Sequence, residues 1–195
     1  GGTQINAAVV GEEGNVLYRI GLPTRAGQTD TGARVLEAID RLLTEAAELF
    51  PHLRIRGIGI GTAGQVDWRE GRIRLSSDLI PGYTGTPLKA LVQEKFGCPA
   101  YVDNDVNVLA HTERRFGAAK DARHFICLAL GTGVGGAIVS DGKLLHGAWG
   151  GAGELGHLSV NFAGPACVCG GRGCLEQYAS GTAIGRRMRE RLAGA

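Results

Sequence analysis

The sequence has little of what marks membrane, secreted or nucleic-acid-binding proteins. No apolar run approaches the roughly 18 residues that span a bilayer, so we expect no membrane association. No charged stretch followed by an apolar one opens the chain, which predicts a cytoplasmic location. The formal net charge is only +2. We interpret the single dense basic patch as a solvated helix face and expect no nucleic-acid partner; it consists of Arg186, Arg187, Arg189 and Arg191.

Glycine is the residue in excess, at 33 of 195 positions, and no repeat or low-complexity tract accounts for it. Because glycine lets a backbone approach a ligand closely, clusters of it indicate loops that grip a bound molecule. Hydrophobic residues make up 44% and charged residues 21% of the chain, which is ordinary for a globular protein with a core. Four glycine clusters lie beside strand-like runs, at 57–64, 131–136, 147–156 and 170–173.

Apolar periodicity divides the chain into strands and helices, in an order typical of an α/β protein. Thr29 or Asp30 is the expected N-cap of the first helix, and Asp141-Gly142 predicts a hairpin turn. A Gly-Thr pair at a predicted strand end occurs at Gly131-Thr132 and, if a strand precedes residue 1, at Gly2-Thr3, each followed by an antiparallel return strand. This repetition indicates two related halves, residues 1–108 and 109–195. Strands are predicted at 5–10, 16–20, 55–60, 100–103, 125–130 and 135–140, and helices at 30–48, 87–96 and 106–116, with further helical stretches from 175 and 182.

A short cysteine-rich loop carries the strongest motif. Cys167, Cys169 and Cys174 lie within eight residues, with His157 ten positions upstream. Three thiolates and one imidazole form a closed tetrahedral site for structural zinc. A Cys-x-Cys disulfide would close a strained ring, and nothing indicates an oxidising compartment. We interpret the remaining cysteines, Cys98 and Cys127, as core residues.

A second glycine-rich segment, residues 131–136, follows the apolar run 125–130. Successive backbone N–H groups in such a turn can hold a phosphate, although a glycine hairpin can also exist without any ligand. It is neither a Walker loop nor a Rossmann turn, because no Gly-Lys-Ser/Thr or helix follows. A similar Gly-Gly-Thr opens the chain, and two such loops could hold one polyphosphate. The expected phosphate ligands are Gly2, Thr3, Gly131, Thr132 and Gly133.

Two carboxylates and two amides crowd the segment 103–107, between a predicted strand and a predicted helix. One of them could simply cap that helix. A single cap does not need four polar side chains, however. A carboxylate near a phosphate loop could instead accept the proton of a substrate hydroxyl, so both interpretations stay open.

Acidic residues also flank the expected metal site. Glu154 precedes His157 by three residues, and Glu176 follows Cys174 by two. Carboxylates beside a rigid loop can accept hydrogen bonds from neighbouring sugar hydroxyls, although Glu176 could equally be a favourable charge in the first turn of a helix. The second ring nitrogen of His157 needs a partner, which could be a sugar hydroxyl or Glu154.

Together these motifs resemble the ROK family of bacterial sugar kinases and sugar-responsive repressors, over nearly the whole chain. The matching segments are Gly1-Gly2-Thr3, the glycine-rich 57–64, Pro81-Gly82-Tyr83 with Pro87-Leu88, Asn104-Asp105, 131–136, Gly153-Glu154-Leu155-Gly156-His157 and the Cys-x-Cys-Gly-x-x-Gly-Cys-Leu-Glu run 167–176.

The resemblance implies an α/β fold of the actin-like ATPase (ribonuclease H-like) class, with two lobes around a cleft, and a homodimer or homotetramer. It implies an ATP- and Mg²⁺-dependent hexose kinase acting in glycolysis, with glucose as the favoured substrate and the sugar 6-hydroxyl as acceptor. Asp105 would be the catalytic base. The implied sugar contacts are Asn104, Asp105, Glu154, His157 and Glu176, and the implied zinc ligands are the four residues named above.

The sequence departs from the family pattern at several points. The Asp that precedes the first phosphate motif would lie upstream of Gly1, and Gln4 replaces a frequent Lys. Asp78-Leu79 stands where many members have Asn-Leu. The second lobe would be incomplete, so we expect a fragment without the extreme N-terminus and the C-terminal third, with the strands 125–130 and 135–140 left uncovered.

Three alternatives to a glucokinase remain at this point. A sugar-responsive transcriptional repressor is built on the same scaffold, with a DNA-binding helix-turn-helix ahead of the first phosphate motif. A kinase for N-acetylmannosamine or another hexose would share the same motifs. A zinc-stabilised carbohydrate-binding module would leave both phosphate loops without a purpose.

Overall fold

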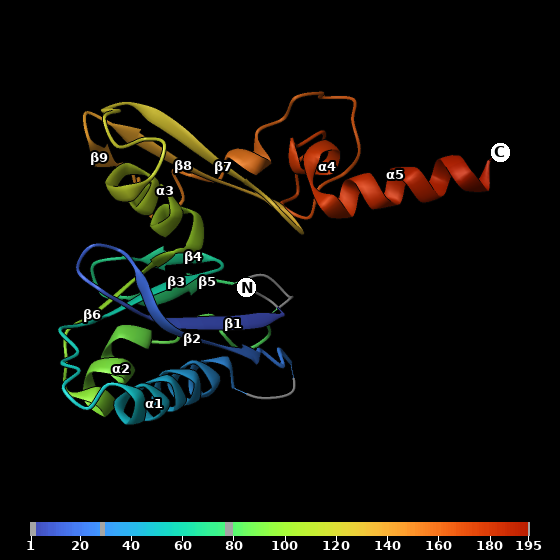
Figure 1. Ribbon diagram of the computed structural model, residues 1–195. Coiled ribbons are helices and arrows are strands. Elements are labelled where there is room, and N and C mark those ends of the chain that lie inside the picture. Colours follow the sequence, from blue (N-terminus) through green and yellow to red (C-terminus); the bar gives the residue numbers. More distant parts are fainter. Residues whose placement is uncertain (1–2, 28–29, 77–79, 195) are drawn as a thin grey trace. The chain divides into compact units, whose positions relative to one another are not determined.

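A computed structural model describes residues 3–27, 30–76 and 80–194 of the chain. The chain forms two compact units, residues 1–105 and 106–195, coloured blue to green and green to red in Figure 1. No described helix has both the length and the apolar character needed to cross a membrane. Assignment of these units to the two lobes expected at 1–108 and 109–195 stays a prediction.

The first unit begins with a β-hairpin that packs on a long helix. β1 (Gln4–Val10) pairs antiparallel with β2 (Val16–Pro23), and helix α1 spans Thr31–Leu49. The Asp30 side chain accepts a hydrogen bond from the Ala33 N–H at 2.9 Å, which confirms it as the N-cap; the alternative, Thr29, lies outside the described residues. Val9, Leu42 and Ala46 form the core between hairpin and helix.

The rest of this unit centres on a parallel strand pair. β3 (Ile58–Thr62) lies beside β6 (Ala100–Asn104), and helix α2 (Leu88–Phe96) ends at Gly97, as predicted, with φ at 63°. The predicted start of β3 at residue 55 is wrong by three residues. The ladder begins where Ile58 pairs with Ala100 of β6. The residue that precedes Ala100 is Pro99, which has no N–H with which to extend the ladder.

A short hairpin in this unit was not predicted. β4 (Gln65–Asp67) pairs antiparallel with β5 (Arg72–Leu75). Its inward side chains, Val66 and Ile73, are almost completely buried. They join Tyr83, Leu88 and Val92 in the largest described core cluster, so the hairpin contributes to the centre of the unit.

The second unit begins with helix α3 packed on a three-stranded antiparallel sheet. α3 spans Asp105–Phe116, and the sheet consists of β7 (Phe125–Leu130), β8 (Val134–Ser140) and β9 (Lys143–Leu144). Val106 and Ala110 of α3 pack on Ala137 and Val139 of β8. The turn at Asp141 and Gly142 has φ values of 51° and 70°, which confirms the predicted hairpin.

The end of the second unit is a short helical turn, a loop and two helices. The 3₁₀ turn η1 spans Leu155–His157, α4 spans Glu176–Ala179 and α5 spans Gly181–Ala193. The outward side chains of β7 are exposed as expected, but the expected exposure of β8 is wrong, because no β8 residue is exposed. Helix α3 covers one face of β8, and Leu155 meets Gly136 on it. The exposed apolar side chains of β7 and α5 are Ile126, Leu128, Leu130, Ile184, Met188 and Leu192.

Candidate functional site

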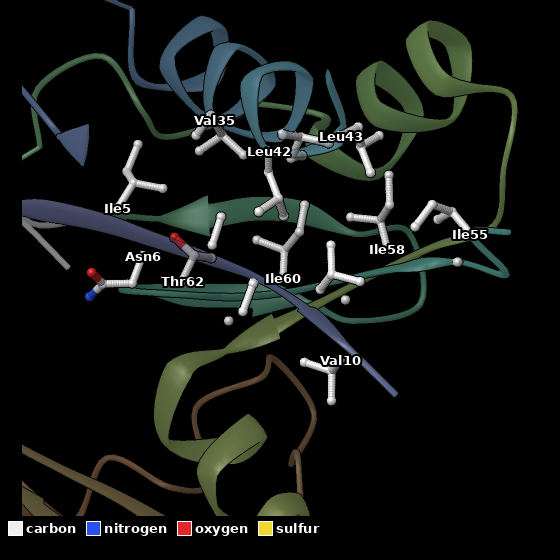
Figure 2. A pocket seen from close by; sticks show the side chains of 18 of the residues that line it. Ile5, Asn6, Val10, Val35, Leu42, Leu43, Ile55, Ile58, Ile60 and Thr62 are labelled. Carbon is white, nitrogen blue, oxygen red and sulfur yellow. The ribbon is translucent and has the colours of Figure 1, made fainter. Parts of the chain in front are cut away.

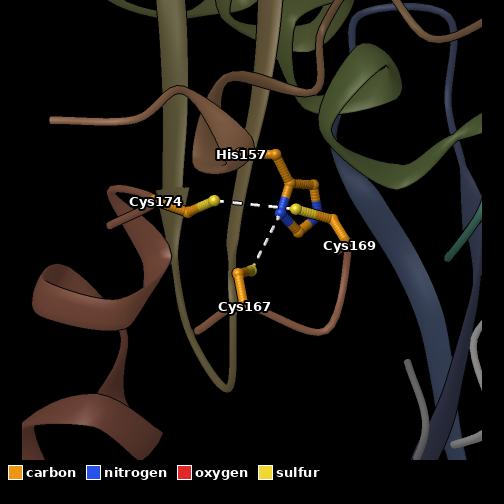
Figure 3. A group of neighbouring side chains, drawn as sticks. All are labelled: His157, Cys167, Cys169 and Cys174. Atoms are coloured by element: carbon orange, nitrogen blue, oxygen red, sulfur yellow. Dashed lines mark hydrogen bonds between the residues drawn. The ribbon is translucent and has the colours of Figure 1, made fainter. Parts of the chain in front are cut away.

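Four potential metal ligands meet in the second unit (Figure 3). The ligand atoms of His157, Cys167, Cys169 and Cys174 all lie within 4.8 Å of one another. Cys167 Sγ is 3.6 Å from His157 Nδ1, and Cys169 Sγ is 3.6 Å from Cys174 Sγ. With metal bonds of about 2.3 Å to sulfur and about 2.0 Å to nitrogen, a tetrahedral zinc ion separates its ligands by about 3.5–3.8 Å. The donor set therefore fits a tetrahedral metal ion.

The loop that carries the cysteines is closed by its own backbone. Cys167 N donates a hydrogen bond to Gly171 O at 2.9 Å, and Gly170 N donates one to Cys167 O at 3.0 Å. A bridge between Ser159 and Cys174 holds the loop against the segment that follows His157. These contacts bring the imidazole and the thiols together although up to 17 residues separate them in the sequence.

Close packing shifts the pKa values of two of the thiols in opposite directions. Burial, followed by hydrogen bonding with Cys167 and Cys169, raises the pKa of Cys174 to about 12. Its side chain needs a neighbouring cation to be a thiolate at neutral pH. The N–H of Gly171 and the neighbouring thiols lower the pKa of Cys169 instead. A metal ion would satisfy both groups.

The second ring nitrogen of His157 faces a carboxylate. Its Nε2 atom lies 3.9 Å from Glu154 Oε2, which is within ion-pair range although longer than a direct hydrogen bond. A carboxylate in this position fixes the orientation of a metal-bound imidazole. Of the two partners that the sequence left open, Glu154 occupies this side of the ring in the structure.

The glycines around Glu154 are required by close packing. A Cβ atom on Gly156 would overlap the carbonyl oxygen of Val134, and one on Gly153 would overlap that of Gly136. Both contacts press the segment carrying Glu154 and His157 directly onto the backbone of β8. The Gly-Glu-x-Gly-His motif therefore has a packing role as well as a chemical one.

The glycine-rich loop between β7 and β8 is anchored by the helices that follow the cysteine loop. Gly181 N donates to Gly131 O at 2.8 Å, and Thr182 Oγ1 donates to Thr132 O at 2.8 Å. Val134 N donates to Glu176 Oε2 at 2.9 Å. The start of α5 and helix α4 therefore fix the position of the loop through three hydrogen bonds.

Two of these anchors, Gly181 and Thr182, were missed by the sequence analysis. Their signal is the run of small residues at the start of α5, where Ser180 accepts a hydrogen bond from Ala183 N. Glu176 was expected to contact sugar. In the structure its carboxylate lies beside Gly133 as well, so this side chain connects the cysteine loop to the glycine-rich loop.

Asn104 and Asp105 stand at the carboxyl end of a strand in the first unit. Asn104 ends β6 and Asp105 is the first residue of α3. Asn104 Nδ2 donates to Gly64 O at 3.1 Å, so its amide is oriented by the turn after β3. Asp105 is exposed and therefore accessible to a substrate, as a general base must be.

The remaining predicted residues are distributed as follows. Thr3 precedes β1 in the first unit, where its carbonyl accepts a hydrogen bond from Thr24 N at 3.0 Å. Gly2, Asp78 and Leu79 lie outside the described residues. Within the second unit the structure brings together the candidate metal ligands, the two acidic residues and the second glycine loop, namely His157, Cys167, Cys169, Cys174, Glu154, Glu176, Gly131, Thr132 and Gly133.

The first unit also contains a large cavity. Its volume is about 750 Å³, and Figure 2 shows it between β1, β3 and α1. Apolar side chains such as Ile5, Leu42 and Ile60 line it together with polar ones such as Asn6 and Thr62. None of the described residues expected to act as base, sugar ligand, phosphate ligand or metal ligand lines it.

Known proteins are similar to this chain in both sequence and structure. The ROK family profile matches residues 1–195. A glucokinase from Streptomyces coelicolor is 39% identical over 191 residues, which cover 98% of this chain and 57% of the relative. The ROK family glucokinase from Streptomyces griseus, solved in complex with glucose and AMPPNP, superposes with a TM-score of 0.82 at 38% identity. That match covers 100% of this chain and 60% of the other.

A regulator is also among the similar structures. A ROK family transcriptional regulator, a homologue of the Escherichia coli MLC protein, superposes with a TM-score of 0.86 at 29% identity, over 99% of this chain and 48% of the other. The α/β fold is the actin-like ATPase fold of these proteins, as expected. This chain spans 57% and 60% of the length of the two glucokinases and 48% of that of the regulator. It belongs to the ROK family.

Proposed function

We propose that the whole protein is an ATP-dependent hexose kinase that phosphorylates the sugar 6-hydroxyl, with glucose as its substrate. One observation carries this proposal: Glu176 links the cysteine loop, which presents candidate sugar ligands, to the glycine loop suited to phosphate. Similarity to a glucokinase solved with glucose and AMPPNP supports the same assignment.

In this mechanism Asp105 accepts the proton of the attacking hydroxyl while Asn104 helps to hold the sugar. Glu154, His157 and Glu176 bind further hydroxyls and fix the orientation of the ring. The backbones of the two Gly-Thr loops, at Gly2-Thr3 and 131–133, hold the phosphates. Mg²⁺, when bound with ATP, would supply positive charge beside the transferring phosphoryl group.

The metal in the cysteine cluster is proposed to be zinc. Its ligands are His157, Cys167, Cys169 and Cys174, whose spacing suits tetrahedral coordination. Four protein ligands leave no position for water, so the role is structural. The ion would stiffen the segment that connects Glu154 and Glu176.

The decisive experiment uses the full-length protein. Glucose, mannose, N-acetylmannosamine and fructose are offered with ATP, and ADP release is followed by a coupled assay. We expect phosphorylation with the highest kcat/KM for glucose. Preference for another sugar would contradict the glucose assignment and leave the kinase assignment intact, whereas no turnover with any sugar would contradict both.

A sugar-responsive repressor is the second candidate, supported by the similarity to a ROK family regulator. The two functions differ in the sequence that precedes residue 1 in the whole protein. A helix-turn-helix there, with sugar-dependent DNA binding in a mobility-shift assay, would favour the repressor. For either function we propose a cytoplasmic homodimer or homotetramer, which sedimentation equilibrium of the full-length protein would test.

A further inference from the structure

Tyr83 lies in the apolar core of the first unit, and its hydroxyl group forms a hydrogen bond with the side chain of Thr62. Tyr83 is 1% exposed and belongs to the main core cluster. Its hydroxyl oxygen lies 3.1 Å from Thr62 Oγ1. Burial raises the pKa of the phenol, so it stays protonated at neutral pH. A buried hydroxyl without a partner would be costly, and Thr62 supplies that partner.

The loop that contains Tyr83 is folded around this side chain. Tyr83 N donates to Ile80 O, and Thr86 Oγ1 donates to Tyr83 O at 2.7 Å. Gly85 N donates to Ile73 O at 2.7 Å, which joins the loop to β5. These hydrogen bonds fix the backbone that carries Tyr83, so the position of the phenol does not depend on Thr62.

Thr62 connects this fixed phenol to a predicted sugar ligand. It is the last residue of β3 and pairs with Asn104 in the parallel ladder. Directly after it the chain turns at Gly64, whose φ is 98° and where a Cβ atom would overlap the Leu75 carbonyl. The Gly64 carbonyl accepts the hydrogen bond from Asn104 Nδ2 at 3.1 Å. A shift at the end of β3 would therefore move the group that orients the Asn104 amide.

We propose that Tyr83 is a positioning residue for the sugar: through Thr62 and the turn at Gly64 it fixes the amide of Asn104 beside Asp105. This inference rests on the proposed role of Asn104 in sugar binding. None of these residues belongs to the glycine loops proposed for phosphate. Their effect should therefore fall on the sugar and spare ATP.

The test removes single hydroxyl groups in the full-length protein. Loss of one hydrogen bond corresponds to about 0.5–1.5 kcal/mol, or about a 2- to 12-fold change in an equilibrium constant. We expect Tyr83→Phe and Thr62→Val each to raise the KM for glucose by about that factor, with the KM for ATP unchanged within about twofold. Both changes break the same contact. The KM for glucose of the double variant should therefore be no higher than that of the single variant with the larger increase. Thr62→Ser keeps the hydroxyl and should behave like the wild type.

Tyr18→Phe is the matched control. Tyr18 also donates its hydroxyl proton across the first unit, to Glu45 Oε2 at 2.6 Å, but it lies on the β2–α1 side, away from Asn104. This variant should lower the melting temperature and leave both KM values unchanged. If Tyr83→Phe behaves in the same way, Tyr83 is only a core residue and the proposal is wrong.

Calorimetric titration with glucose separates this proposal from the kinase assignment. A several-fold weaker Kd in Tyr83→Phe and Thr62→Val, but not in Tyr18→Phe or Thr62→Ser, supports positioning even in a protein without turnover. Equal Kd values in all five proteins would overturn the positioning role, whether or not the wild type phosphorylates glucose. Absence of any glucose binding by the wild type would overturn the glucose assignment and the positioning role for glucose, while the kinase assignment would be decided by the assay with the other sugars.

Discussion

Glu154 and His157 face each other, with Oε2 of the carboxylate 3.9 Å from Nε2 of the ring, while Nδ1 of the same ring lies 3.6 Å from the sulfur of Cys167. One imidazole thus lies between a candidate metal site and a candidate sugar ligand. Disturbance of the metal should reach the sugar through this ring. A change of Glu154 should leave the metal in place, because this carboxylate is not one of the four candidate metal ligands.

Glu154→Gln tests the sugar side of this pair. The amide keeps the size of the side chain but loses the charge that binds hydroxyls most strongly. We expect the KM for glucose to rise about tenfold, from about 1.4 kcal/mol of lost binding, with little change in the KM for ATP and with the metal content retained. Steady-state kinetics and elemental analysis measure these quantities, with the exposed Glu94→Gln as control. An equal rise in both KM values would place Glu154 outside the sugar site.

Cys169→Ser tests the metal. Serine is a poor zinc ligand, so the purified variant should contain less than one zinc per chain, where the wild type contains one. Hydrogen exchange should increase over residues 163–175, and the affinity for sugar should fall. Cys98→Ser, outside the cluster, should keep the full zinc content. A wild-type protein free of zinc, or one with a disulfide among the cluster cysteines, would refute the assignment.

Asp105→Asn tests the proposed base. Removal of a positioned general base typically lowers the rate by about 10²–10⁴, so kcat should fall by this factor while glucose binding persists. Asp103→Asn is the matched control, because the Asp103 side chain accepts a hydrogen bond from Asn104 N at 2.7 Å and an amide oxygen can do the same. A decrease of less than tenfold in Asp105→Asn would identify Asp105 as a helix-terminal residue only.

Two glycine substitutions separate packing from phosphate binding. Gly156→Ala places a methyl group against the Val134 carbonyl, and overpacking of this kind costs about 1–3 kcal/mol. Its melting temperature should fall clearly. At Gly131 an added Cβ meets no atom within 4 Å, so Gly131→Ala should keep its stability while the KM for ATP rises. Similar melting temperatures for the two variants would contradict the packing role of Gly156.

Residues 1–195 expressed alone should be inactive and poorly soluble. Phosphoryl transfer requires sugar and nucleotide to be positioned together, and the matched relatives are considerably longer than this chain. Ile126, Leu128 and Leu130 on β7, with Ile184 and Met188 on α5, form exposed apolar faces that favour aggregation. Sedimentation and the kinase assay measure both properties. Sugar phosphorylation by the isolated chain would show that it already contains a complete nucleotide site.

Local signals predicted much of the fold. Helix α2 lies between Pro87 and Gly97 because these residues favour the start and the end of a helix. The β4–β5 hairpin escaped prediction because a three-residue strand, Gln65–Asp67, is too short to show alternation. The start of β3 depends on Pro99, a residue about 40 positions away in the neighbouring strand, and no local pattern reports such a partner.

The candidate site also combines features that local sequence predicts with features that depend on residues far apart in the chain. The four candidate metal ligands could be named in advance because most of their spacing is local, and the structure brings them together. The hydrogen bond between Glu176 and Val134 joins residues 42 positions apart. The contact between Tyr83 and Thr62 arises from the packing of a loop on a strand end. Contacts of this kind depend on tertiary structure, so only the residue types could be named in advance.

Among the four cluster residues, Cys169 alone is exposed, while Cys167 and Cys174 are buried and His157 is half-buried. Of the three sulfur ligands, that of Cys169 is therefore the most open to solvent. An incoming chelator would displace this ligand first, and a bound ion would leave by the same route. The lifetime of the ion should therefore depend on how often the Cys169 bond opens, so that exchange of an isotopically labelled metal is slow in the folded protein and limited by this one residue.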